Sequence, residues 1–565
     1  MAYIGTELVA RSDVLAEVLV EPATSGYGGA TVYRLKLSQL PTGRAISYAE
    51  LILPKGFPEN AIARIRLPSD AVLRIPHVER DGFLCIDGDP GPGRGLDGTQ
   101  RVETLVSKFY IEFLEPWSNG NLDGDFAKEP QNYWALNVDR LKTKQDTACR
   151  LWTVDSVPIK AKVREGLLLL PGRLIVAGDG DNLLVRRIVA SLGHRAKQRV
   201  RVIIADIPIS YSFVPETWPR NLEALLSLLR ARLKQSEYQR FFEQSLRQRR
   251  SREHRIALFR NHEGGFAFVL PGGPPVIHQK GNRYCAQRTH SNIQPLLVDR
   301  IDPEWTVGRD QIRQVSARQQ QHVVVFGAGA LGSLVVEQLA KAGIGQISLV
   351  DSDIMETANL GRHLLGVENI DYAKADAVAN DVNRKFPSCI IKPYNGTVEQ
   401  WLQVNTLKRI DVALDLTGEP EVRWQLNEAR RKHPCKLIVG WMEPFVAAAH
   451  VCMLTSETLW FTAQTCTEDR LNLLEAVDWP DEVIRQVPGC SSRFQAYTPA
   501  NSAYAVALIS ENALRLIDGE VDGSKTLSWV RGRQFLDKNW QRLSYRDWAA
   551  GAAQYDGITI ERPFI

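Results

Sequence analysis

The chain has 565 residues, more than one hydrophobic core organises, so we expect two or three domains. Its apolar and charged fractions, 44% and 24%, are those of an ordinary globular protein, and its net charge of +4 does not mark the whole chain as a nucleic-acid binder. No apolar run reaches the roughly 20 residues that cross a bilayer, and the first residues lack the layout of a signal peptide, so we expect a cytoplasmic protein with no membrane partner.

The cysteines exclude two further classes. None of the eight belongs to a C-x-x-C pair, so the sequence predicts neither a zinc clamp nor a disulfide framework. In a reducing compartment most of them should be free thiols, and the reactivity of each is then a separate question. They are Cys85, Cys149, Cys285, Cys389, Cys435, Cys452, Cys466 and Cys490.

Residues 1–125 have the pattern of short strands joined by turns. Three segments, YRLKL (33–37), ISYAELILP (46–54) and ARIRLP (63–68), have the apolar spacing of β-strands and are separated by Pro and Gly. The Gly- and Pro-rich run DGDPGPGRGLDG (87–98) is predicted to be a loop.

A candidate nucleophile lies in the stretch LRIPHVERDGFLCIDGD (73–89). This stretch resembles the active site of ubiquitin-conjugating enzymes, whose pattern is H-P-N-V-x-x-D-G-x-I-C-L-D. The resemblance covers about residues 30–120 and implies an α+β domain over 1–125 in which Cys85 carries a thioester. The alternative is a buried strand cysteine, since FLCI is apolar. The residues that match in register are Val78, Asp81, Gly82, Cys85 and Asp87.

The same stretch departs from the family at two positions. Ile75 stands where the family has His, and His77 stands where it has Asn. That Asn helps to stabilise the oxyanion when an amine attacks the thioester. The resemblance therefore implies that His77 supplies part of this stabilisation, the alternative being another group.

Residues 126–300 are predicted to form a mixed α/β bridging segment. LLLLPGRLIVAG (167–178) and VRVIIADIPIS (200–210) have the composition of buried strands, and residues 221–255 are predicted to form one long amphipathic helix. The end of that helix is rich in arginine, which indicates a solvated face or, alternatively, a site for an acidic partner. These arginines are Arg247, Arg249, Arg250, Arg252 and Arg255.

From about residue 300 the pattern changes to strand, glycine turn, helix and strand. The apolar run QHVVVF ends at Gly327, and Gly327, Gly329 and Gly332 form G-x-G-x-x-G before a predicted helix. Such a turn brings backbone amides and a helix N-terminus to a phosphate, and an acidic residue at the end of the next strand, here Asp351, can bind ribose hydroxyls. The sequence predicts a parallel sheet flanked by helices, with NAD(P) as the default ligand.

The residues that follow favour ATP instead. LVDSDIMETANLGRHLL (349–365) and the later DYAKADA add cationic side chains, which a dinucleotide does not need but a triphosphate with a leaving pyrophosphate does. The pattern GxGxxGS, D-x-D, N-L-x-R and a later Lys resembles the ThiF/MoeB/ubiquitin-activating family over about residues 305–520. The resemblance implies a Rossmann-like adenylation domain over 301–565 that uses ATP and Mg²⁺. It assigns the nucleotide site to Gly327, Gly329, Gly332, Asp351, Asp353, Asn359, Arg362 and Lys374, with Asp351 on the ribose and the last three residues on the phosphates.

Two further positions concern the metal and a neighbouring subunit. The family usually has T-D-N after its fourth strand, with the Asp near magnesium, whereas DVALDLTGEP (411–420) has Gly418 there. Asp415 or Glu419 is then expected to hold magnesium, the alternative for Asp415 being a strand-end carboxylate. Arg309 resembles the arginine that related dimers lend to the neighbouring subunit's nucleotide, the alternative being a surface arginine.

The resemblance also implies a cysteine that captures the acyl group from the adenylate. Cys490, in IRQVPGCSSRFQAYTPANSAYA, lies where the family has its acceptor cysteine, and Cys466 is the second candidate. Cys389, Cys435 and Cys452 adjoin apolar runs and are predicted to be buried packing residues.

The order of the two resemblances, a conjugating-type domain before an activating-type domain, resembles the fused proteins of bacterial antiphage operons, such as those of CBASS systems. It implies adenylation of a protein's C-terminal carboxylate, transfer to Cys490, then to Cys85, then to a target lysine. The expected substrate is a cGAS-like nucleotidyltransferase or a ubiquitin-like protein, and the expected assembly is a homodimer. The alternatives are a ThiF/MoeB-like sulfur-carrier adenylyltransferase, which would carry a cysteine-zinc clamp, and a non-catalytic scaffold or NAD-binding module.

Overall fold

The computed structural model describes most of the chain as helices, strands and ordered connections. The described residues are 17–23, 29–37, 44–141, 150–178, 180–211, 213–247, 254–262, 264–270, 276–280, 283–287, 293–462, 474–480, 485–486, 493–494, 497–539 and 543–564. They divide into two compact units, one made of residues 1–180 and 197–300 and the other of residues 181–196 and 301–565. Within the described ranges, no helix combines the length and the apolar character needed to cross a bilayer.

The first unit begins with an antiparallel sheet in the order β1-β2-β3-β4. The predicted strands at 33–37, 46–54 and 63–68 are confirmed as β2, β3 and β4, and the run 87–98 is a loop up to Gly98. A continuous helical segment follows and packs its apolar face on the sheet, so that Leu51, Ile65, Val102 and Phe109 share one core. The elements are β1 Leu19–Ala23, β2 Thr31–Leu35, β3 Ala49–Leu53, β4 Arg64–Arg66, α3 Gly98–Lys108, a π-helical turn at Phe109–Leu114, and α4 Glu115–Ser118.

A closed barrel forms the rest of this unit, in the order β10-β13-β5-β7-β6-β8-β9. The buried strands predicted at 167–178 and 200–210 are confirmed as β6, β7 and β8. Helix α5 packs on the barrel through Trp134, whose indole N–H donates to the carbonyl of Leu296 (2.7 Å). The bounds are α5 Pro130–Leu141, β5 Arg150–Thr153, β6 Lys162–Pro171, β7 Leu174–Ala177, β8 Ala196–Pro208, β9 His254–Arg260, β10 Gly265–Val269 and β13 Gln294–Arg300, with a separate hairpin of β11 Val276–Lys280 and β12 Arg283–Gln287.

The prediction of one long helix over 221–255 is wrong. The segment forms two helices, α7 (Leu222–Arg232) and α8 (Gln235–Arg247), because Leu233 adopts an extended conformation and buries its side chain. Arg255 belongs to β9 and is buried beside the Phe242 ring, so it is no part of a solvated helix face. Arg249, Arg250 and Arg252 lie outside the described residues.

The second unit is built on an eight-stranded sheet in the order β16-β15-β14-β17-β18-β19-β22-β23. Strands β16 to β18 pair in parallel, and β19, β22 and β23 continue the sheet in antiparallel pairing. The bounds are β14 His322–Phe326, β15 Gln346–Asp351, β16 Ile390–Asn395, β17 Val412–Asp415, β18 Lys436–Met442, β19 Ala448–Leu454, β22 Lys525–Arg531 and β23 Gly557–Pro563.

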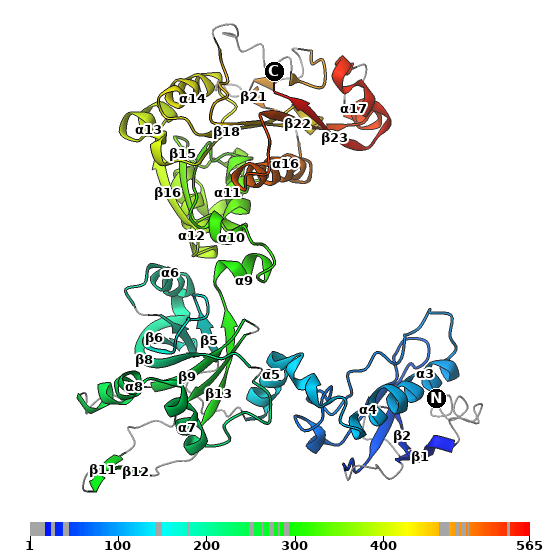
Figure 1. The fold of residues 1–565 in the computed structure, drawn as a ribbon. Helices are drawn as coiled ribbons and strands as arrows, with labels where there is room; N and C mark the ends of the chain where they lie inside the picture. The colour runs from blue at the N-terminus through cyan, green and yellow to red at the C-terminus, as the bar shows by residue number, and fades with distance from the viewer. Residues whose placement is uncertain are drawn as a thin grey trace. The chain divides into compact units, whose positions relative to one another are not determined.

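Alternate side chains of this sheet enter two separate cores, one on each face. Val323 and Val325 pack with α11, α12 and α16, whereas Val324 and Phe326 pack with α13 and α14. Figure 1 shows α11 and α16 on one side of the strands and α13 and α14 on the other. This arrangement confirms the α/β class and the parallel sheet flanked by helices. The helices are α11 Gly332–Lys341, α12 Lys374–Lys385, α13 Val398–Val404, α14 Pro420–Lys432, α16 Pro499–Ile517 and α17 Arg533–Asn539.

One helix of the second unit comes from an earlier part of the chain. Helix α6 (Leu183–Leu192) packs on α12, and its Arg187 donates to the side-chain oxygen of Asn383 (2.6 Å) and to the carbonyl of Cys389. Residues 181–196 therefore interrupt the sequence of the barrel and belong to the second unit.

Candidate functional site

The glycine turn follows β14 at the carboxyl edge of the parallel strands. Gly327 has φ +93°, and a Cβ at Gly332 would lie 1.8 Å from the carbonyl oxygen of Gly327, so these two positions require glycine. A Cβ at Gly329 would meet no protein atom within 4 Å. The turn is thus tight on its protein side and open at Gly329, which fits a phosphate approaching the backbone at the start of α11.

Asp351, at the end of β15, fixes this turn. Its Oδ2 accepts from the Ala328 amide (2.6 Å) and its Oδ1 from the Asp353 amide (2.8 Å). Burial raises the pKa of its carboxyl, although these two amide donors partly oppose that effect. The predicted ribose ligand therefore also holds the backbone of the turn, next to the strand end where ribose would lie.

Lys374 lies at the same edge as the first residue of α12. Its Nζ donates to Oδ2 of Asp353 (2.9 Å), and its own amide donates to the Asp353 carbonyl (2.9 Å). The lysine side chain is 10% exposed, whereas the aspartate side chain is 66% exposed. The cation is thus held at the strand ends and is paired with a carboxylate that is open to solvent.

Asn359 and Arg362 come from the connection between β15 and α12. The Asn359 side-chain oxygen accepts from the Glu356 amide (2.9 Å), which closes a short helical turn at Thr357–Asn359. The Arg362 guanidinium lies 5.7 Å from the centre of the Tyr497 ring, just before α16. Both predicted phosphate ligands are therefore held in the segment that follows Asp351.

His363 is a residue of this site that the sequence analysis missed. Its Nε2 donates to the carbonyl of Ala328 (2.6 Å) and its Nδ1 accepts from the Leu365 amide (3.1 Å), which is the hydrogen-bonding pattern of a neutral imidazole. Burial lowers its pKa, and the nearby Lys374 lowers it further. His363 thereby links the segment that contains Asn359 and Arg362 to the glycine turn. Its place directly after Arg362 in N-L-x-R was the available signal.

The carboxylates expected near magnesium differ in their surroundings. Asp415 is buried, and its Oδ1 accepts from the amide and the hydroxyl of Thr417 (3.1 and 2.7 Å), while Arg423 lies 3.8 Å from its Oδ2. Glu419 is exposed at the start of α14. Of the two, Glu419 fits a hydrated metal better, because it is open to solvent, whereas the buried Asp415 carboxylate already contacts Thr417 and Arg423.

Arg309 ends helix α9 (Pro303–Gly308). It is exposed, with φ +49°, and its guanidinium carbon lies 6.0 Å from the centre of the Trp305 ring. This is the environment of a side chain held on the surface by one aromatic contact.

The cysteines of the second unit divide into buried and undescribed ones. Cys389, Cys435 and Cys452 are buried, as predicted, and burial raises the pKa of Cys389 to about 12. A thiol with such a pKa is a poor nucleophile near neutrality. Cys490 and Cys466 lie outside the described residues.

Cys85, in the first unit, is exposed. It follows a tight turn in which Val78 pairs with Leu84, and its amide donates to the carbonyl of His77 (2.7 Å). Nε2 of His77 lies 2.8 Å from Oδ2 of Asp125, and the amide of His77 donates to the hydroxyl of Tyr133 (2.9 Å). The structure thus brings His77 beside Cys85 and adds Asp125 and Tyr133, which the sequence analysis did not connect with this cysteine.

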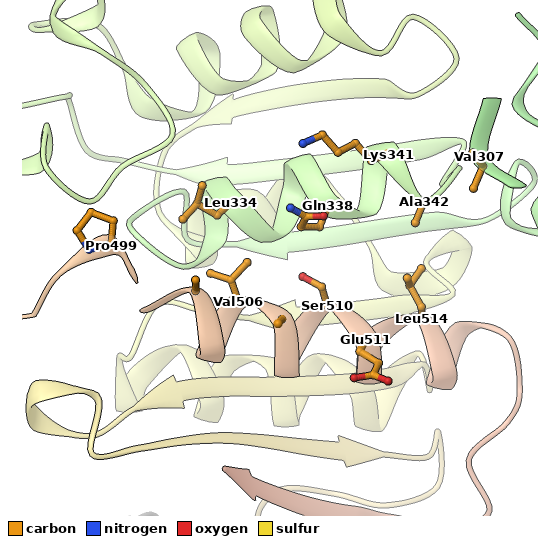
Figure 2. A pocket seen from close by; sticks show the side chains of 12 residues that line it. Val307, Leu334, Gln338, Lys341, Ala342, Pro499, Val506, Ser510, Glu511 and Leu514 are labelled. Carbon is orange, nitrogen blue, oxygen red and sulfur yellow. The ribbon is translucent and has the colours of Figure 1, made fainter. Parts of the chain in front are cut away.

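A groove lies between α11 and α16, apart from these residues. Figure 2 shows Leu334, Gln338 and Lys341 of α11 facing Val506, Ser510 and Leu514 of α16. None of the residues predicted to bind the nucleotide lines this groove. It is therefore distinct from the glycine turn.

Comparison with protein families matches residues 306–543 to the ThiF family. Two bacterial relatives are each described as "ATP-dependent ubiquitin transferase-like protein Cap2". The one from Pseudomonas aeruginosa is 24% identical over 506 residues, which are 82% of this chain and 84% of the relative. The one from Enterobacter hormaechei is 29% identical over 144 residues, and these span only about a quarter (24%) of each chain.

Other similar proteins align with a smaller part of the chain. The "Adenylyltransferase and sulfurtransferase UBA4" of Yarrowia lipolytica is 31% identical over 154 residues, 27% of this chain and 35% of the relative. Among solved structures, E. coli MccB with ATP is 14% identical and covers 41% of this chain and 65% of that chain, with a TM-score of 0.31. The chain thus carries a ThiF-family domain and is similar to Cap2 over most of its length.

Proposed function

We propose that this chain, whose residues 306–543 match the ThiF family, is an enzyme. It uses ATP to adenylate the C-terminal carboxylate of a protein and then conjugates that carboxylate to an amine. The observation that carries the proposal is the sheet edge where the open glycine turn, Asp351 and Lys374 meet. An anion is favoured there by backbone amides, a helix N-terminus and a fixed ammonium group. Similarity to Cap2 over 82% of the chain supports the same activity for the whole protein.

The first step is attack of the substrate carboxylate on the α-phosphorus of ATP, with loss of pyrophosphate. Lys374, and with it Arg362 and Asn359, would stabilise the charge that develops on the phosphates. Asp351 and His363 both hydrogen-bond to the backbone of Ala328, so they would hold the glycine turn in a fixed position relative to the segment that contains Asn359 and Arg362. Magnesium would be held near Glu419, with Asp415 as the second carboxylate of this edge.

The acyl group then passes from AMP to the thiolate of Cys490 and from there to Cys85. A thiolate is a strong nucleophile near neutrality, so the adenylate needs little activation of the acceptor. Exposure of Cys85 supports its role as the last carrier, because both the incoming thioester and the target lysine must reach its sulfur.

We propose a cGAS-like nucleotidyltransferase as the protein substrate, as in a CBASS system, because the Pseudomonas and Enterobacter relatives are Cap2 proteins. A ubiquitin-like protein would undergo the same chemistry. The chain is also proposed to act as a homodimer in which Arg309 reaches the neighbouring subunit's nucleotide.

A second candidate function is sulfur-carrier activation. It is favoured by the 31% identity to an adenylyltransferase and sulfurtransferase of Yarrowia lipolytica. It predicts no role for Cys85, whereas the conjugation proposal requires one. Conjugation that depends on Cys85 would therefore separate the two.

The test of the adenylation step is exchange of labelled pyrophosphate into ATP. The chain is mixed with Mg-ATP and a cGAS-like nucleotidyltransferase that has a free C-terminus, and with the same protein lacking its last residues as the control. We expect exchange only with the free C-terminus, and no competition by NAD. Exchange that is independent of the C-terminus, or loss of exchange on addition of NAD, would contradict the proposal.

A further inference from the structure

The backbone of His77 is fixed directly opposite the candidate nucleophile. Val78 and Leu84 form an antiparallel bridge, and the next pair outward is His77 and Cys85, joined by the hydrogen bond from the Cys85 amide to the His77 carbonyl (2.7 Å). His77 has φ +62°, which is unfavourable for a residue with a side chain, and the Tyr133 hydroxyl accepts its amide N–H (2.9 Å). A strained residue held from both sides next to an exposed thiol indicates a functional position.

The ring of His77 is oriented by Asp125. Its Nε2 lies 2.8 Å from Oδ2 of Asp125, while Oδ1 of the same carboxylate accepts from Lys128 (2.6 Å). Burial raises the pKa of Asp125, but the hydrogen bonds from Lys128 and His77 outweigh burial and hold that pKa below its usual value. The carboxylate is therefore ionised and can only accept, so Nε2 of His77 carries the proton.

This tautomer leaves a basic nitrogen free for chemistry. In a neutral imidazole with its proton on Nε2, the lone pair lies on Nδ1. Within the described residues, no side chain or amide hydrogen-bonds Nδ1, and the His77 side chain is 29% exposed. An incoming amine can reach this nitrogen from solvent.

We propose that His77 is a catalytic base that takes a proton from the attacking lysine ammonium at Cys85, and that Asp125 is the residue that positions its ring. This inference rests on the proposed role of Cys85 as the final thioester carrier. In this proposal His77 transfers a proton, whereas the resemblance assigns position 77 to oxyanion stabilisation. The asparagine that the family has at this position cannot transfer a proton.

The step balances as follows. The lysine ammonium gives one proton to Nδ1, and the amine lone pair attacks the thioester carbonyl while the carbonyl pair moves to oxygen. Return of that pair breaks the C–S bond, and Cys85 leaves as a thiolate. The nitrogen of the new amide loses its remaining extra proton to water, and His77 returns its own proton to water.

Several titratable groups lie around this ring. They come from the helical turn at Asp123–Ala127, from the residues that lead into α5 and from α5 itself, and from the segment opposite His77. The pKa of the Tyr133 hydroxyl is raised, chiefly by burial; the hydrogen bond from the His77 amide opposes this, and the nearby Glu129, Asp125 and Cys85 add to it. The groups are Asp125, Lys128, Glu129, Tyr133 and Cys85.

The experiment loads Cys85 without ATP and then measures its discharge. The full-length chain is incubated with a synthetic peptide whose C-terminal glycine is a mercaptoethanesulfonate thioester, and Cys85→Ala is used to subtract transfer to other cysteines. Loss of the peptide from Cys85 is followed by mass spectrometry in free lysine and, separately, in hydroxylamine, which is already unprotonated at neutral pH.

The variants are His77→Asn, which tolerates the positive φ and keeps a hydrogen-bond donor, and Asp125→Asn. The matched control is Asp123→Asn, whose carboxylate pairs with Arg44 instead (2.6 Å).

For lysine at pH 7 we expect both variants to discharge about 10²-fold more slowly than the parent, in line with loss of a general base. The difference should shrink to less than about tenfold by pH 9.5, where free lysine amine becomes abundant. With hydroxylamine, and for Asp123→Asn with either acceptor, rates should stay within about threefold of the parent.

Two results would overturn the proposal in distinguishable ways. If Cys85 accepts the peptide and His77→Asn keeps the parental pH dependence with lysine, His77 is no base and the carrier role of Cys85 still stands. If Cys85 does not accept the peptide at all, the carrier role fails and the inference with it. Because loading bypasses ATP, neither result depends on the adenylation step.

Discussion

Lys374 is the residue on which the nucleotide assignment depends most. Its side chain is nearly buried, whereas Asp353, its carboxylate partner within the described residues, is largely exposed. We expect the ammonium group to bind a phosphate of ATP from this position.

Replacing Lys374 by Ala should lower ATP–pyrophosphate exchange about 10²–10³-fold, since a lost charge contact to a reacting group costs about 3–4 kcal/mol of transition-state stabilisation. Lys385→Ala is the matched control on the same helix, because Lys385 pairs with Glu337 and Asp381 at the surface. Exchange by Lys374→Ala at the parental rate would remove the lysine from the phosphate site.

Glu475 makes the free energy of unfolding of the second unit depend on pH. Burial, and then the charge of Glu443, raise the pKa of Glu475 to about 7 despite its contact with Arg546 (3.2 Å). A raised pKa means that the folded state holds the proton more tightly than the unfolded state. Folding stability from this group is therefore present below about pH 4.5 and is lost as the pH rises to about 7.

Glu475→Gln should accordingly leave the melting temperature nearly unchanged at pH 4.5 and raise it at pH 8, by an amount equivalent to about 1–2 kcal/mol. Differential scanning calorimetry at both values measures this directly. Glu561→Gln, which removes an exposed partner of Lys525, serves as the control and should show no such pH-dependent gain. A gain for Glu475→Gln that is equal at both pH values would show that the effect is not proton-linked.

At the scale of elements, two glycines of the turn are expected to have different roles, structural for Gly332 and ligand-binding for Gly329. Gly332→Ala forces a Cβ against the Gly327 carbonyl, whereas Gly329→Ala meets no protein atom. Gly332→Ala should therefore lower the melting temperature of the second unit. Gly329→Ala should keep the melting temperature and weaken ATP binding at least several-fold, because its methyl group would occupy the space left for phosphate. Calorimetric titration with ATP distinguishes them, and unchanged affinity in a folded Gly329→Ala would place the phosphate elsewhere.

The local pattern of the sequence was sufficient where periodicity and turn residues agree. The strand before Gly327, the glycine turn and the acidic strand end at Asp351 were all predictable, because each is encoded within about 30 consecutive residues. Strands β2, β3 and β4 of the first sheet and the loop at 87–98 were predictable for the same reason.

Elements set by tertiary contacts were not predictable in this way. The apolar spacing over 221–255 continues through Leu233, so the sequence gives no signal for the break that packing on the barrel imposes. The pairing of His77 with Asp125 joins residues 48 positions apart, and the bond from His363 to Ala328 joins residues 35 apart. Such contacts depend on how helices and turns meet, which composition and periodicity do not encode.

At the scale of the whole molecule, the second unit uses a helix from the middle of the sequence. Arg187 of α6 is partly buried against α12, where burial lowers its pKa and its guanidinium satisfies Asn383 and the Cys389 carbonyl. A domain boundary at residue 300, as predicted from the sequence, leaves this helix outside the C-terminal domain, whereas in the structure residues 181–196 form one compact unit with residues 301–565.

Arg187→Ala should therefore destabilise the second unit by about 1–3 kcal/mol, through loss of the hydrogen bonds to buried groups. In calorimetry of the full chain the melting transition of that unit should fall by roughly 2–8 °C. The neighbouring, exposed Arg186→Ala is the control and should change it little. Equal effects of the two substitutions would argue against a structural role for α6 in this unit.

The relay of an acyl group between two cysteines is the claim that joins the two units into one enzyme, and trapping its thioesters tests it most directly. The full chain, Cys85→Ala and Cys490→Ala are each incubated with Mg-ATP and a cGAS-like nucleotidyltransferase, and reductant-sensitive adducts are located by mass spectrometry. We predict adducts on both cysteines in the parent, an adduct on Cys490 alone in Cys85→Ala, and pyrophosphate exchange without any thioester in Cys490→Ala. An adduct on Cys85 in the Cys490→Ala variant, or a first adduct on Cys466 in the parent, would contradict this account.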